Sequence, residues 1–314
     1  MINLNTTKVA VIGSGLIGRA WAIVFARSGV EVNIFDQSKD ALGECLSLIK
    51  ALLEDKLKYG LLEEDASKIL SRIHPVHTLE LACEGVSLVQ ENIKETVEAK
   101  LALFADLDRI CPGTVILASS TSWLPTSLFT EKLPGRARCL VAHPTNPPYL
   151  IPLVELSPAP WTSAETVERA LEFYTAVKQE PVLVKKEIHG FLLNRVQGAV
   201  LNEMLNLYEE GYASSADLDK VMKYGLGLRW SFMGPFETID LNAPAGVTDY
   251  AARYGQTYAD VSKTQKDNAW SAQVIKKIEN ERREILDSNQ ISERSRWRDN
   301  RLMALKKHQD EQPK

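Results

Sequence analysis

The stretch from Lys8 to Asp36 constrains the fold more than any other part of the chain. Residues 9–12 are a short apolar run, typical of a buried strand. They lead directly into Gly13-Ser14-Gly15-Leu16-Ile17-Gly18, and apolar residues then recur at helical spacing as far as Phe25. Residues 30–35 form a second apolar strand that ends in Asp36. The stretch therefore predicts a strand, a tight turn, a helix and a second strand.

The three glycines of this turn have the spacing G-x-G-x-x-G, which is typical of dinucleotide-binding units. Gly13 permits the tight turn, Gly15 lets the backbone approach a pyrophosphate, and Gly18 lets the helix lie close to the strand. The pyrophosphate would rest against the free N–H groups at the helix start, around Leu16 and Ile17. The alternative is a glycine-rich turn in some other α/β protein, but the strand before it and the helix after it argue against that.

Asp36 lies about 20 residues beyond the glycines, at the end of the next strand. A carboxylate there accepts hydrogen bonds from an adenosine ribose and repels an added 2′-phosphate. Lys39 could attract that phosphate, but Asp36 is the closer match to the pattern. We therefore expect NAD rather than NADP as the cofactor.

The composition is that of an ordinary globular protein: 314 residues, 45% hydrophobic, 25% charged, with a formal charge of −4. This near balance gives no electrostatic reason to expect nucleic acid or an anionic membrane as partner. Neither a signal peptide nor a membrane-spanning run is found, so we expect a cytosolic protein. The cysteines have no metal-ligand spacing and predict buried, reduced thiols without a metal: Cys45, Cys83, Cys111 and Cys139.

Beyond Asp36, apolar runs alternate with amphipathic segments, which predicts an α/β domain with a mostly parallel sheet covered on both faces. The expected strands are 73–76, 86–90, 115–118, 139–142, 153–156 and 181–184. After about residue 188 only helical patterns remain. We expect a Rossmann-type domain over residues 1–188 and an all-helical domain over 189–314, which would bind substrate and dimerise. The charged stretch after 274 predicts a solvated helix and tail, of which Trp297, Leu302, Met303 and Leu305 indicate a packed part.

Three polar segments follow predicted strands, at residues 90–92, 119–122 and 143–146. Since ligands gather at the carboxyl ends of parallel strands, we expect these segments to face one crevice. His143 precedes a proline, which favours an extended backbone at a loop. A neutral imidazole is a suitable proton acceptor near neutral pH, although a histidine can also be purely structural.

Glu155 lies among Leu153, Val154 and Leu156, where a carboxylate is costly unless it is paired or solvated. A hydrogen bond to one ring nitrogen of His143 would fix the tautomer and make the other nitrogen a better base. The alternative is a glutamate at an exposed strand end. We therefore expect a His143–Glu155 pair at the crevice.

Several further motifs occur in order along nearly the whole chain: VQENIKE at 89–95, SSTS at 119–122, HPTNPPYLIPLVEL at 143–156, GFLLNRV at 190–196 and GPFET at 234–238. With GSGLIG and Asp36, they make the chain similar to the L-3-hydroxyacyl-CoA dehydrogenase superfamily. Within it, the chain most resembles the lambda-crystallin branch, also known as L-gulonate 3-dehydrogenase, because of the 143–156 motif, residues 209–238 and the late RWRDNRLMAL.

The resemblance implies roles for matching positions. His143 would remove the proton of a 3-hydroxyl, with Glu155 as its partner. Ser122 would hydrogen-bond the reacting oxygen, and Asn194 would contact the substrate from the helical domain. From the residues alone, Ser122 could be an ordinary loop hydroxyl and Asn194 a helix cap. The remaining expected contacts are Glu91, Glu95 and Lys100 near the cofactor and Asn146 near the substrate.

Arg229 departs from the pattern of the acyl-CoA members, which have small or aromatic residues before GPFE. Its planar guanidinium suits a carboxylate, so we expect it to bind the acid end of a free hydroxy acid. The alternative is a surface or interdomain ion pair. The sequence thus predicts an NAD-dependent L-3-hydroxy acid dehydrogenase, with L-gulonate as leading substrate and 3-hydroxybutyryl-CoA or L-carnitine as alternatives. A non-catalytic NAD-binding regulator or a crystallin-like structural protein are the rivals from other classes.

Overall fold

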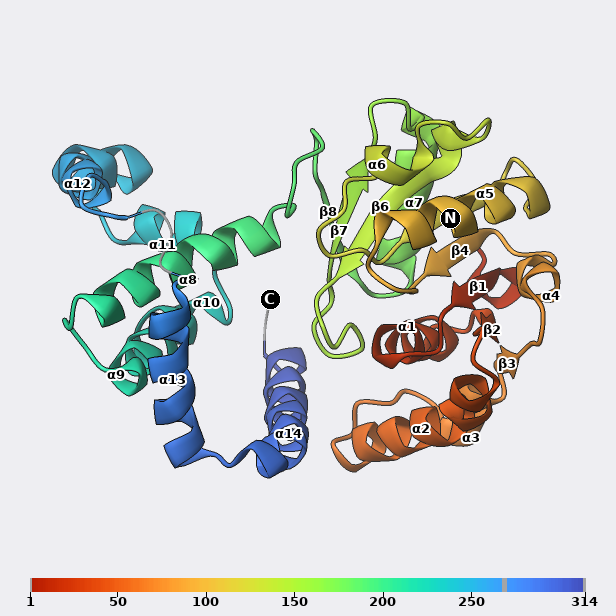
Figure 1. The fold of residues 1–314 in the computed structure, drawn as a ribbon, viewed down its shortest axis with the longest axis horizontal. Helices are drawn as coiled ribbons and strands as arrows, with labels where there is room; N and C mark the ends of the chain where they lie inside the picture. Colours follow the sequence, from red (N-terminus) through yellow and green to blue (C-terminus); the bar gives the residue numbers. More distant parts are fainter. Residues whose placement is uncertain (1, 267–269, 313–314) are drawn as a thin grey trace. The chain divides into compact units, whose positions relative to one another are not determined.

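The computed structural model describes residues 2–266 and 270–312, whose helices and strands are labelled in Figure 1. The chain divides into two compact units. The first contains the residues up to Asn194 together with those from Arg298 onward, and the second contains Arg195–Trp297. Within the described residues, no helix combines the length and the apolar character needed to cross a membrane.

An eight-stranded sheet forms the centre of the first unit, in the order β3-β2-β1-β4-β5-β6-β7-β8. All neighbouring strands run parallel except β6 and β7, which are antiparallel. This confirms the predicted Rossmann-type, mostly parallel sheet. The strand order reverses at β1, so its carboxyl end is a place where ligands bind. The strands are β1 (Lys8–Ile12), β2 (Glu31–Phe35), β3 (Ile73–Pro75), β4 (Leu88–Glu91), β5 (Ile116–Ser119), β6 (Cys139–Pro144), β7 (Leu153–Pro158) and β8 (Glu180–Leu183).

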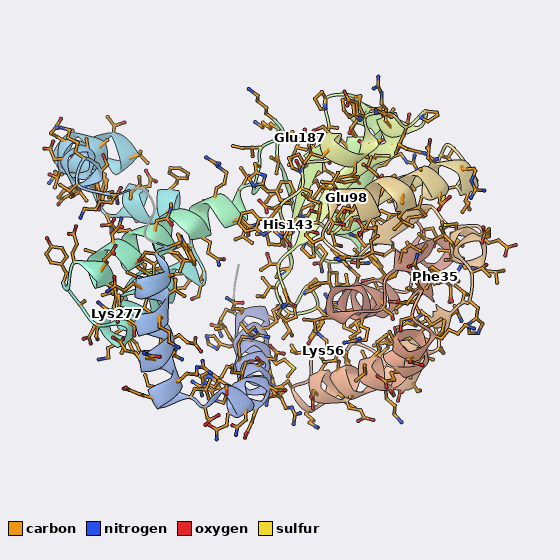
Figure 2. The ribbon with its side chains drawn as sticks, viewed as in Figure 1. Phe35, Lys56, Glu98, His143, Glu187 and Lys277 are labelled. Atoms are coloured by element: carbon orange, nitrogen blue, oxygen red, sulfur yellow. The ribbon has the colours of Figure 1, made fainter. Side chains whose placement is uncertain are left out.

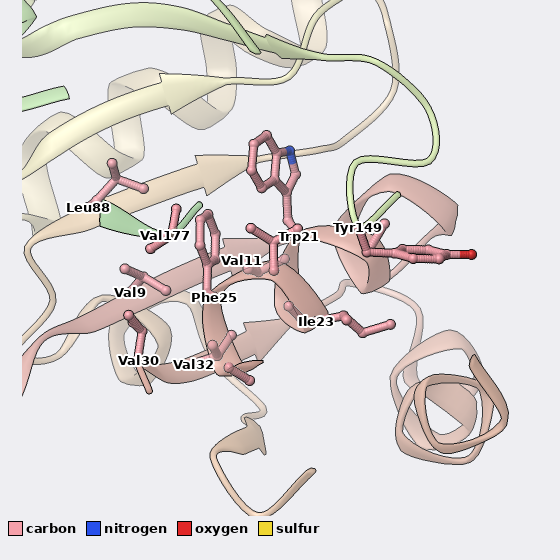
Figure 3. Packing of buried hydrophobic residues seen from close by; sticks show 14 of the residues in the cluster. Val9, Val11, Trp21, Ile23, Phe25, Val30, Val32, Leu88, Tyr149 and Val177 are labelled. Carbon is pink, nitrogen blue, oxygen red and sulfur yellow. The ribbon is translucent and has the colours of Figure 1, made fainter. Parts of the chain in front are cut away.

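Helices cover both faces of the sheet, and alternate residues of β1 supply the two sides of the core. Val9 and Val11 pack in one cluster with the rings of Trp21 and Phe25, whose centroids are 5.1 Å apart (Figure 3). Ala10 and Ile12 pack in a second cluster on the other face. The helical segments are η1 (Leu4–Thr6), α1 (Leu16–Arg27), α2 (Lys39–Lys58), α3 (Ala66–Leu70), α4 (Leu79–Cys83), α5 (Val97–Ile110), α6 (Ser127–Thr130), η2 (Arg136–Arg138) and α7 (Ala164–Ala176).

Side-chain caps fix where several of these helices begin. The hydroxyl oxygens of Ser38, Thr96 and Ser163 accept hydrogen bonds from backbone N–H groups in the first turns of α2, α5 and α7. Such a cap satisfies one of the donors that the first turn leaves free and contributes about 1 kcal/mol. Helix α1 differs, because Gly15 at its start supplies no side chain and leaves those N–H groups open.

The chain after residue 192 is helical, as predicted. Ser214 caps the start of α9, because its hydroxyl oxygen accepts a hydrogen bond from the N–H of Asp217. A small core forms around Leu205 and Val274 in the second unit. The elements are α8 (Leu193–Glu209), α9 (Ser215–Lys220), the π-helix η3 (Val221–Leu226), α10 (Gly227–Trp230), α11 (Pro235–Leu241), α12 (Gly246–Ser262), α13 (Ala272–Ile285), η4 (Ser288–Gln290) and α14 (Ile291–Asp310).

The end of α14 belongs to the first unit. Met303 is buried in the larger core cluster there, and Leu302 packs against it. The prediction that part of the charged C-terminal stretch packs is therefore confirmed, while Trp297 and Leu305 remain exposed. Residues 313–314 lie outside the described residues.

Two local features differ from expectation. Helix α4 was not predicted, because its five residues are too few for a periodic pattern. His143 lies within β6 and not in the loop after it, because the strand continues through Pro144. Pairing with β7 extends it, with Pro144 opposite Val154 and His143 opposite Glu155.

Candidate active site

The turn between β1 and α1 has the geometry that the three glycines predict. Gly13 has a φ of +97°, and its N–H donates to the carbonyl of Phe35 at 2.8 Å. A Cβ on Gly13 would lie 2.6 Å from the carbonyl oxygen of Asn92, and one on Gly18 only 1.8 Å from that of Gly13. Beside Gly15, in contrast, no atom lies within 4 Å of the position of a Cβ. The turn is thus closed toward the protein and open toward a ligand.

A cavity of about 770 Å³ extends from this turn and is lined by Gly13, Gly15 and Asp36. Its walls also include the apolar side chains of Leu79, Ile93 and Leu103. The start of α1, where Leu16 is exposed and Ile17 is half-buried, offers N–H groups that no side chain caps. An apolar cavity beside an open helix N-terminus suits an adenosine attached to a pyrophosphate.

The Asp36 carboxylate is held at the edge of this cavity. Its Oδ2 accepts from the backbone N–H of Ser14 at 2.7 Å and from the Ser14 hydroxyl at 3.0 Å. Its Oδ1 accepts from the N–H of Ser38 at 2.9 Å. These neutral donors fix the carboxylate without neutralising it, so it still repels a 2′-phosphate. Lys39 is exposed beside it.

His143 and Glu155 form the predicted pair in the interior of the first unit. Nδ1 of the ring lies 2.8 Å from Oε2 of the carboxylate, and the two side chains are 6% and 2% exposed. Figure 2 marks His143 at the end of β6. Because Nδ1 is engaged by the carboxylate, Nε2 is the ring nitrogen left for a proton transfer.

The other oxygen of Glu155 is also engaged. Its Oε1 accepts from the N–H groups of Leu192 and Leu193 at 2.7 and 2.8 Å, at the beginning of α8. Burial by itself would raise the pKa of the Glu155 carboxyl. The hydrogen bond with His143 and the two backbone donors outweigh burial and lower the pKa below its usual value. Glu155 therefore stays ionised beside the ring at neutral pH.

The loop that carries Ser122 is held by hydrogen bonds between its backbone and two side chains. Glu95 accepts from the backbone N–H of Ser122 at 2.9 Å and from the Thr121 hydroxyl. Asn194 donates from Nδ2 to the carbonyl oxygen of Ser122 at 2.7 Å. Both backbone groups of Ser122 are thus occupied, while its side-chain hydroxyl makes no hydrogen bond to any described residue. Asn194 and Glu95 hold the loop, and Ser122 Oγ is free for a ligand.

Glu91 and Lys100 are turned toward each other. Lys100 Nζ lies 2.9 Å from both oxygens of Glu91, and the side chains are 1% and 0% exposed. The Ser119 hydroxyl donates to the same carboxylate at 2.5 Å. Glu95, whose side chain is 40% exposed, lies 3.6 Å from Lys100. The buried Glu91–Lys100 pair therefore links the end of β4 to α5 and to the end of β5. Of these charged side chains, only that of Glu95 reaches solvent.

Asn146 and Arg229 are the two remaining predicted substrate contacts. Asn146 is exposed in the connection between β6 and β7. Arg229 is exposed on α10 of the second unit, and among the residues described no carboxylate forms an ion pair with it. Its guanidinium is therefore available to a ligand or a partner.

The sequence indicates the 190–196 motif but no role for its Phe191 or for the backbone of the two residues that follow it. Phe191 is fully buried at a φ of +49°, and its ring centroid is 5.4 Å from that of His143. It directly precedes the two N–H donors to Glu155. The glycine at 190, also at positive φ, was the available signal. A second unpredicted group lies behind the strand ends, where the Ser120 hydroxyl joins Gln90, Asn92 and Trp21 by hydrogen bonds of 2.7–3.0 Å.

Comparisons with known proteins agree with this geometry. Residues 8–188 match the family model described as 3-hydroxyacyl-CoA dehydrogenase, NAD binding domain, and residues 190–283 match the C-terminal domain of the same family. A lambda-crystallin homolog of Rattus norvegicus is 41% identical over 305 residues, 95% of each chain. An L-carnitine dehydrogenase of Oceanobacillus iheyensis is 36% identical over 79% of this chain and 80% of its own. The solved structure of a 3-hydroxyacyl-CoA dehydrogenase from Archaeoglobus fulgidus is similar with a TM-score of 0.68, at 28% identity over 87% of each chain.

Proposed function

The chain belongs to the 3-hydroxyacyl-CoA dehydrogenase family, and we propose that it oxidises the 3-hydroxyl of a small L-3-hydroxy acid to the 3-keto acid. NAD is the cofactor, as in the family. The observation that carries the proposal is the buried His143–Glu155 pair, in which Nδ1 of the ring is engaged by the carboxylate while Nε2 has no hydrogen bond to a described residue. The open turn at Gly15 and the Asp36 carboxylate fit the cofactor.

In the proposed reaction His143 is the base. NAD, when bound, supplies the acceptor for the hydride that leaves C3 of the substrate. Nε2 of His143 takes the hydroxyl proton, and the ring becomes a cation next to the Glu155 carboxylate. Because that carboxylate is ionised and lies 2.8 Å away, it stabilises the cation that forms on the ring.

Ser122 and Asn194 would hold the substrate's reacting end. The free Ser122 hydroxyl donates to the oxygen that becomes a carbonyl, which stabilises the charge that develops there. One Asn194 donor is occupied by the Ser122 carbonyl, so the remaining amide groups are those that would contact the substrate. Glu95 would act near the cofactor, with Glu91 and Lys100 as its buried support. Asn146 is a further proposed substrate contact.

Among possible substrates we favour L-gulonate. The likeness to lambda-crystallin homologs extends over nearly the whole chain. An exposed Arg229 without an ion-pair partner is suited to a free carboxylate, which gulonate has and a coenzyme A thioester lacks. L-Carnitine, the substrate named for the 36% identical relative, also has a free carboxylate and is the second candidate. 3-Hydroxybutyryl-CoA is the third.

One panel assay separates these substrates. L-gulonate, L-carnitine, 3-hydroxybutyrate and 3-hydroxybutyryl-CoA are each offered with NAD and with NADP, and NADH or NADPH formation is followed. We expect the highest kcat/KM with gulonate and NAD. A higher kcat/KM with the thioester would overturn the free-acid assignment while leaving the dehydrogenase assignment in place.

A non-catalytic role is the alternative from another class, because some relatives bear the name crystallin. The presence of the complete group Ser122, His143, Glu155 and Asn194 favours catalysis. If NAD bound tightly but no 3-hydroxy acid or thioester gave turnover, the chain would instead be an NAD-binding structural or regulatory protein.

We further propose that the protein is a cytosolic homodimer that associates through its helical region. The proposed domain boundary lies between residues 188 and 189. The second unit exposes many large apolar side chains, and clustered exposed apolar surface is typical of protein interfaces. Light scattering after gel filtration would give twice the chain mass for a dimer. The exposed apolar side chains of the second unit include Tyr224, Leu228, Phe232, Phe236, Leu241 and Tyr258.

The four cysteines are free and buried, as predicted.

A further inference from the structure

A second cavity lies in the first unit, away from the glycine turn. It has a volume of about 520 Å³ and lies where the ends of α1 and α2, the connection between β6 and β7, and the end of α14 come together. Arg27 and Lys56 contribute its two inner cationic side chains. Figure 2 marks Lys56 near the end of α2, and Figure 3 shows the Tyr149 ring directed away from the core around Trp21.

Two cations of this cavity share one neutral acceptor. Arg27 Nη1 donates to the carbonyl oxygen of Tyr149 at 2.8 Å, and Lys56 Nζ donates to the same oxygen at 3.1 Å. Lys56 is only 2% exposed. No carboxylate in residues 2–266 or 270–312 lies within ion-pair distance of either cation. A single carbonyl cannot compensate the positive charges of the buried Lys56 and the half-buried Arg27, because it carries only a partial charge.

Two of the carboxylates that line the cavity are paired with other lysines of its lining. Glu63 pairs with Lys178 at 2.5 Å, and Asp310 pairs with Lys306 at 2.5 Å. Glu180 also lines the cavity but is exposed to solvent. The interior of the cavity therefore keeps an excess of positive charge. Burial, and then the neighbouring Arg27, lower the pKa of Lys56 to about 7, as expected for a cation without a counter-ion.

Two buried hydrogen-bonding groups in the same cavity also have no partner within the described part of the chain. Arg27 Nε is a buried donor without an acceptor. Gln179 is 2% exposed, and its Oε1 is a buried acceptor without a donor. Lys56 Nζ donates one of its three hydrogens to the Tyr149 carbonyl and also faces the ring of Tyr149, whose centroid is 5.5 Å away. Buried polar groups are nearly always hydrogen-bonded, so this combination indicates a ligand that both accepts and donates.

We propose that this cavity binds a small oxyanion that carries a hydroxyl group, either hydrogen phosphate or a hydroxycarboxylate. The anionic oxygens accept from Lys56 Nζ and Arg27 Nε, and the hydroxyl donates to Gln179 Oε1. Tyr149 lies in the connection between β6 and β7, so the anion binds beside the segment that joins His143 to Glu155. The proposal is independent of which substrate the enzyme oxidises.

Four probes test the proposal by calorimetry and by thermal unfolding of the full chain saturated with NAD, which fills the other anion site. Phosphate is compared with sulfate, and glycolate with acetate. In each pair only the first anion carries a hydroxyl group. We expect phosphate and glycolate to bind more tightly than sulfate and acetate and to raise Tm. Comparing phosphate with glycolate identifies which source of the shared chemistry fits better. Failure of the folded protein to bind any of the four overturns the proposal.

Two variants assign the binding to this cavity. Lys56→Met is expected to weaken phosphate and glycolate binding by roughly tenfold or more, whereas Lys50→Met, an exposed position on the same helix, leaves it unchanged. Equal binding by Lys56→Met and the unaltered protein contradicts the proposal. Gln179→Leu retains both cations, so it is expected to bind anions but to lose the preference for phosphate over sulfate. A preference that persists in this variant also counts against the assignment, even if Lys56→Met does not fold.

Discussion

His143 and Glu155 lie directly opposite each other on β6 and β7, the one antiparallel pair of neighbouring strands in the described sheet. Opposite residues of an antiparallel pair have their side chains on the same face of the sheet. The reversal of β7 thus brings two side chains, twelve residues apart in sequence, to 2.8 Å. The proposed base and its partner depend on strand direction as much as on residue type.

The first prediction concerns the base. His143→Asn preserves a polar side chain but has no nitrogen able to take the proton. We expect kcat to fall by about 10²–10⁴-fold, the usual contribution of general base catalysis. NAD affinity, measured by fluorescence titration, should stay unchanged because the glycine turn is untouched. Retention of most of the kcat would remove His143 from the mechanism.

The second prediction concerns the charge on Glu155. Glu155→Gln keeps an acceptor for the ring and for the backbone of Leu192 but removes the negative charge. The cation that forms on the ring during the reaction then lacks its counter-charge. We expect kcat/KM to fall by roughly tenfold or more, while the affinity for NAD stays unchanged. A kcat/KM equal to that of the unaltered protein would show that the pair is only structural.

The third prediction concerns cofactor choice. Asp36→Ala removes the carboxylate that would accept from the ribose, and charged hydrogen bonds contribute about 1.5–3 kcal/mol. The KM for NAD should therefore rise roughly ten- to a hundredfold, while the ratio of NADP to NAD activity increases. Lys39→Ala serves as control and should alter the NAD kinetics little. A variant that still rejects NADP as strongly as before would contradict this role.

The fourth prediction concerns substrate recognition. Arg229→Ala should raise the KM for an acidic substrate by roughly tenfold or more, with the KM for NAD unaltered. Arg229→Lys keeps the charge but lacks the planar fork, so its KM should lie between the two. Steady-state kinetics with the best acid of the panel measure both. An unchanged KM in the alanine variant would show that Arg229 has another role.

The fifth prediction concerns pH and stability. Lys56 has a pKa of about 7 in the folded protein against about 10.4 in an unfolded chain, because burial, Arg27 and Lys306 outweigh Asp310. Between these values the unfolded chain binds more protons, so stability rises with pH. Below pH 7 both states are protonated and the folded protein bears the full cost of the buried charge.

Lys56→Met removes that cost. The substitution should raise the free energy of unfolding most below pH 7, by about 1.4 kcal/mol for each tenfold by which folding lowers the proton affinity of Lys56. The increase should become progressively smaller toward pH 10. Urea unfolding at a series of pH values in an anion-free buffer measures the difference. A difference that does not depend on pH would show that Lys56 does not titrate as described.

The sequence predicted the features that depend on local patterns. The turn at Gly13, the first strands and helices, and the change to helices after residue 188 follow from glycine spacing and hydrophobic period. The His143–Glu155 pair followed from a different argument, namely the cost of a carboxylate among apolar residues, and it is confirmed by the 2.8 Å separation.

Other features depend on distant parts of the chain meeting, and no local pattern contains them. The direction of β7 is set by the fold of the whole domain. The cavity at Tyr149 combines residues from α1, α2 and α14, so Arg27 and Lys56 are unremarkable in sequence. The burial of Glu91 against Lys100 likewise arises between a strand end and a helix that the sequence does not align.

The arrangement around Ser122 has a consequence for the entropy of substrate binding. Glu95 and Asn194 hold its N–H and carbonyl before any substrate arrives, so only one side-chain torsion remains to be fixed. Ordering a main-chain residue costs about 1–2 kcal/mol, and here folding has already met that cost. In the proposed role, a substrate alcohol would meet a hydroxyl on a backbone that is already ordered, and removing either hydrogen bond would return that entropy cost to the binding step.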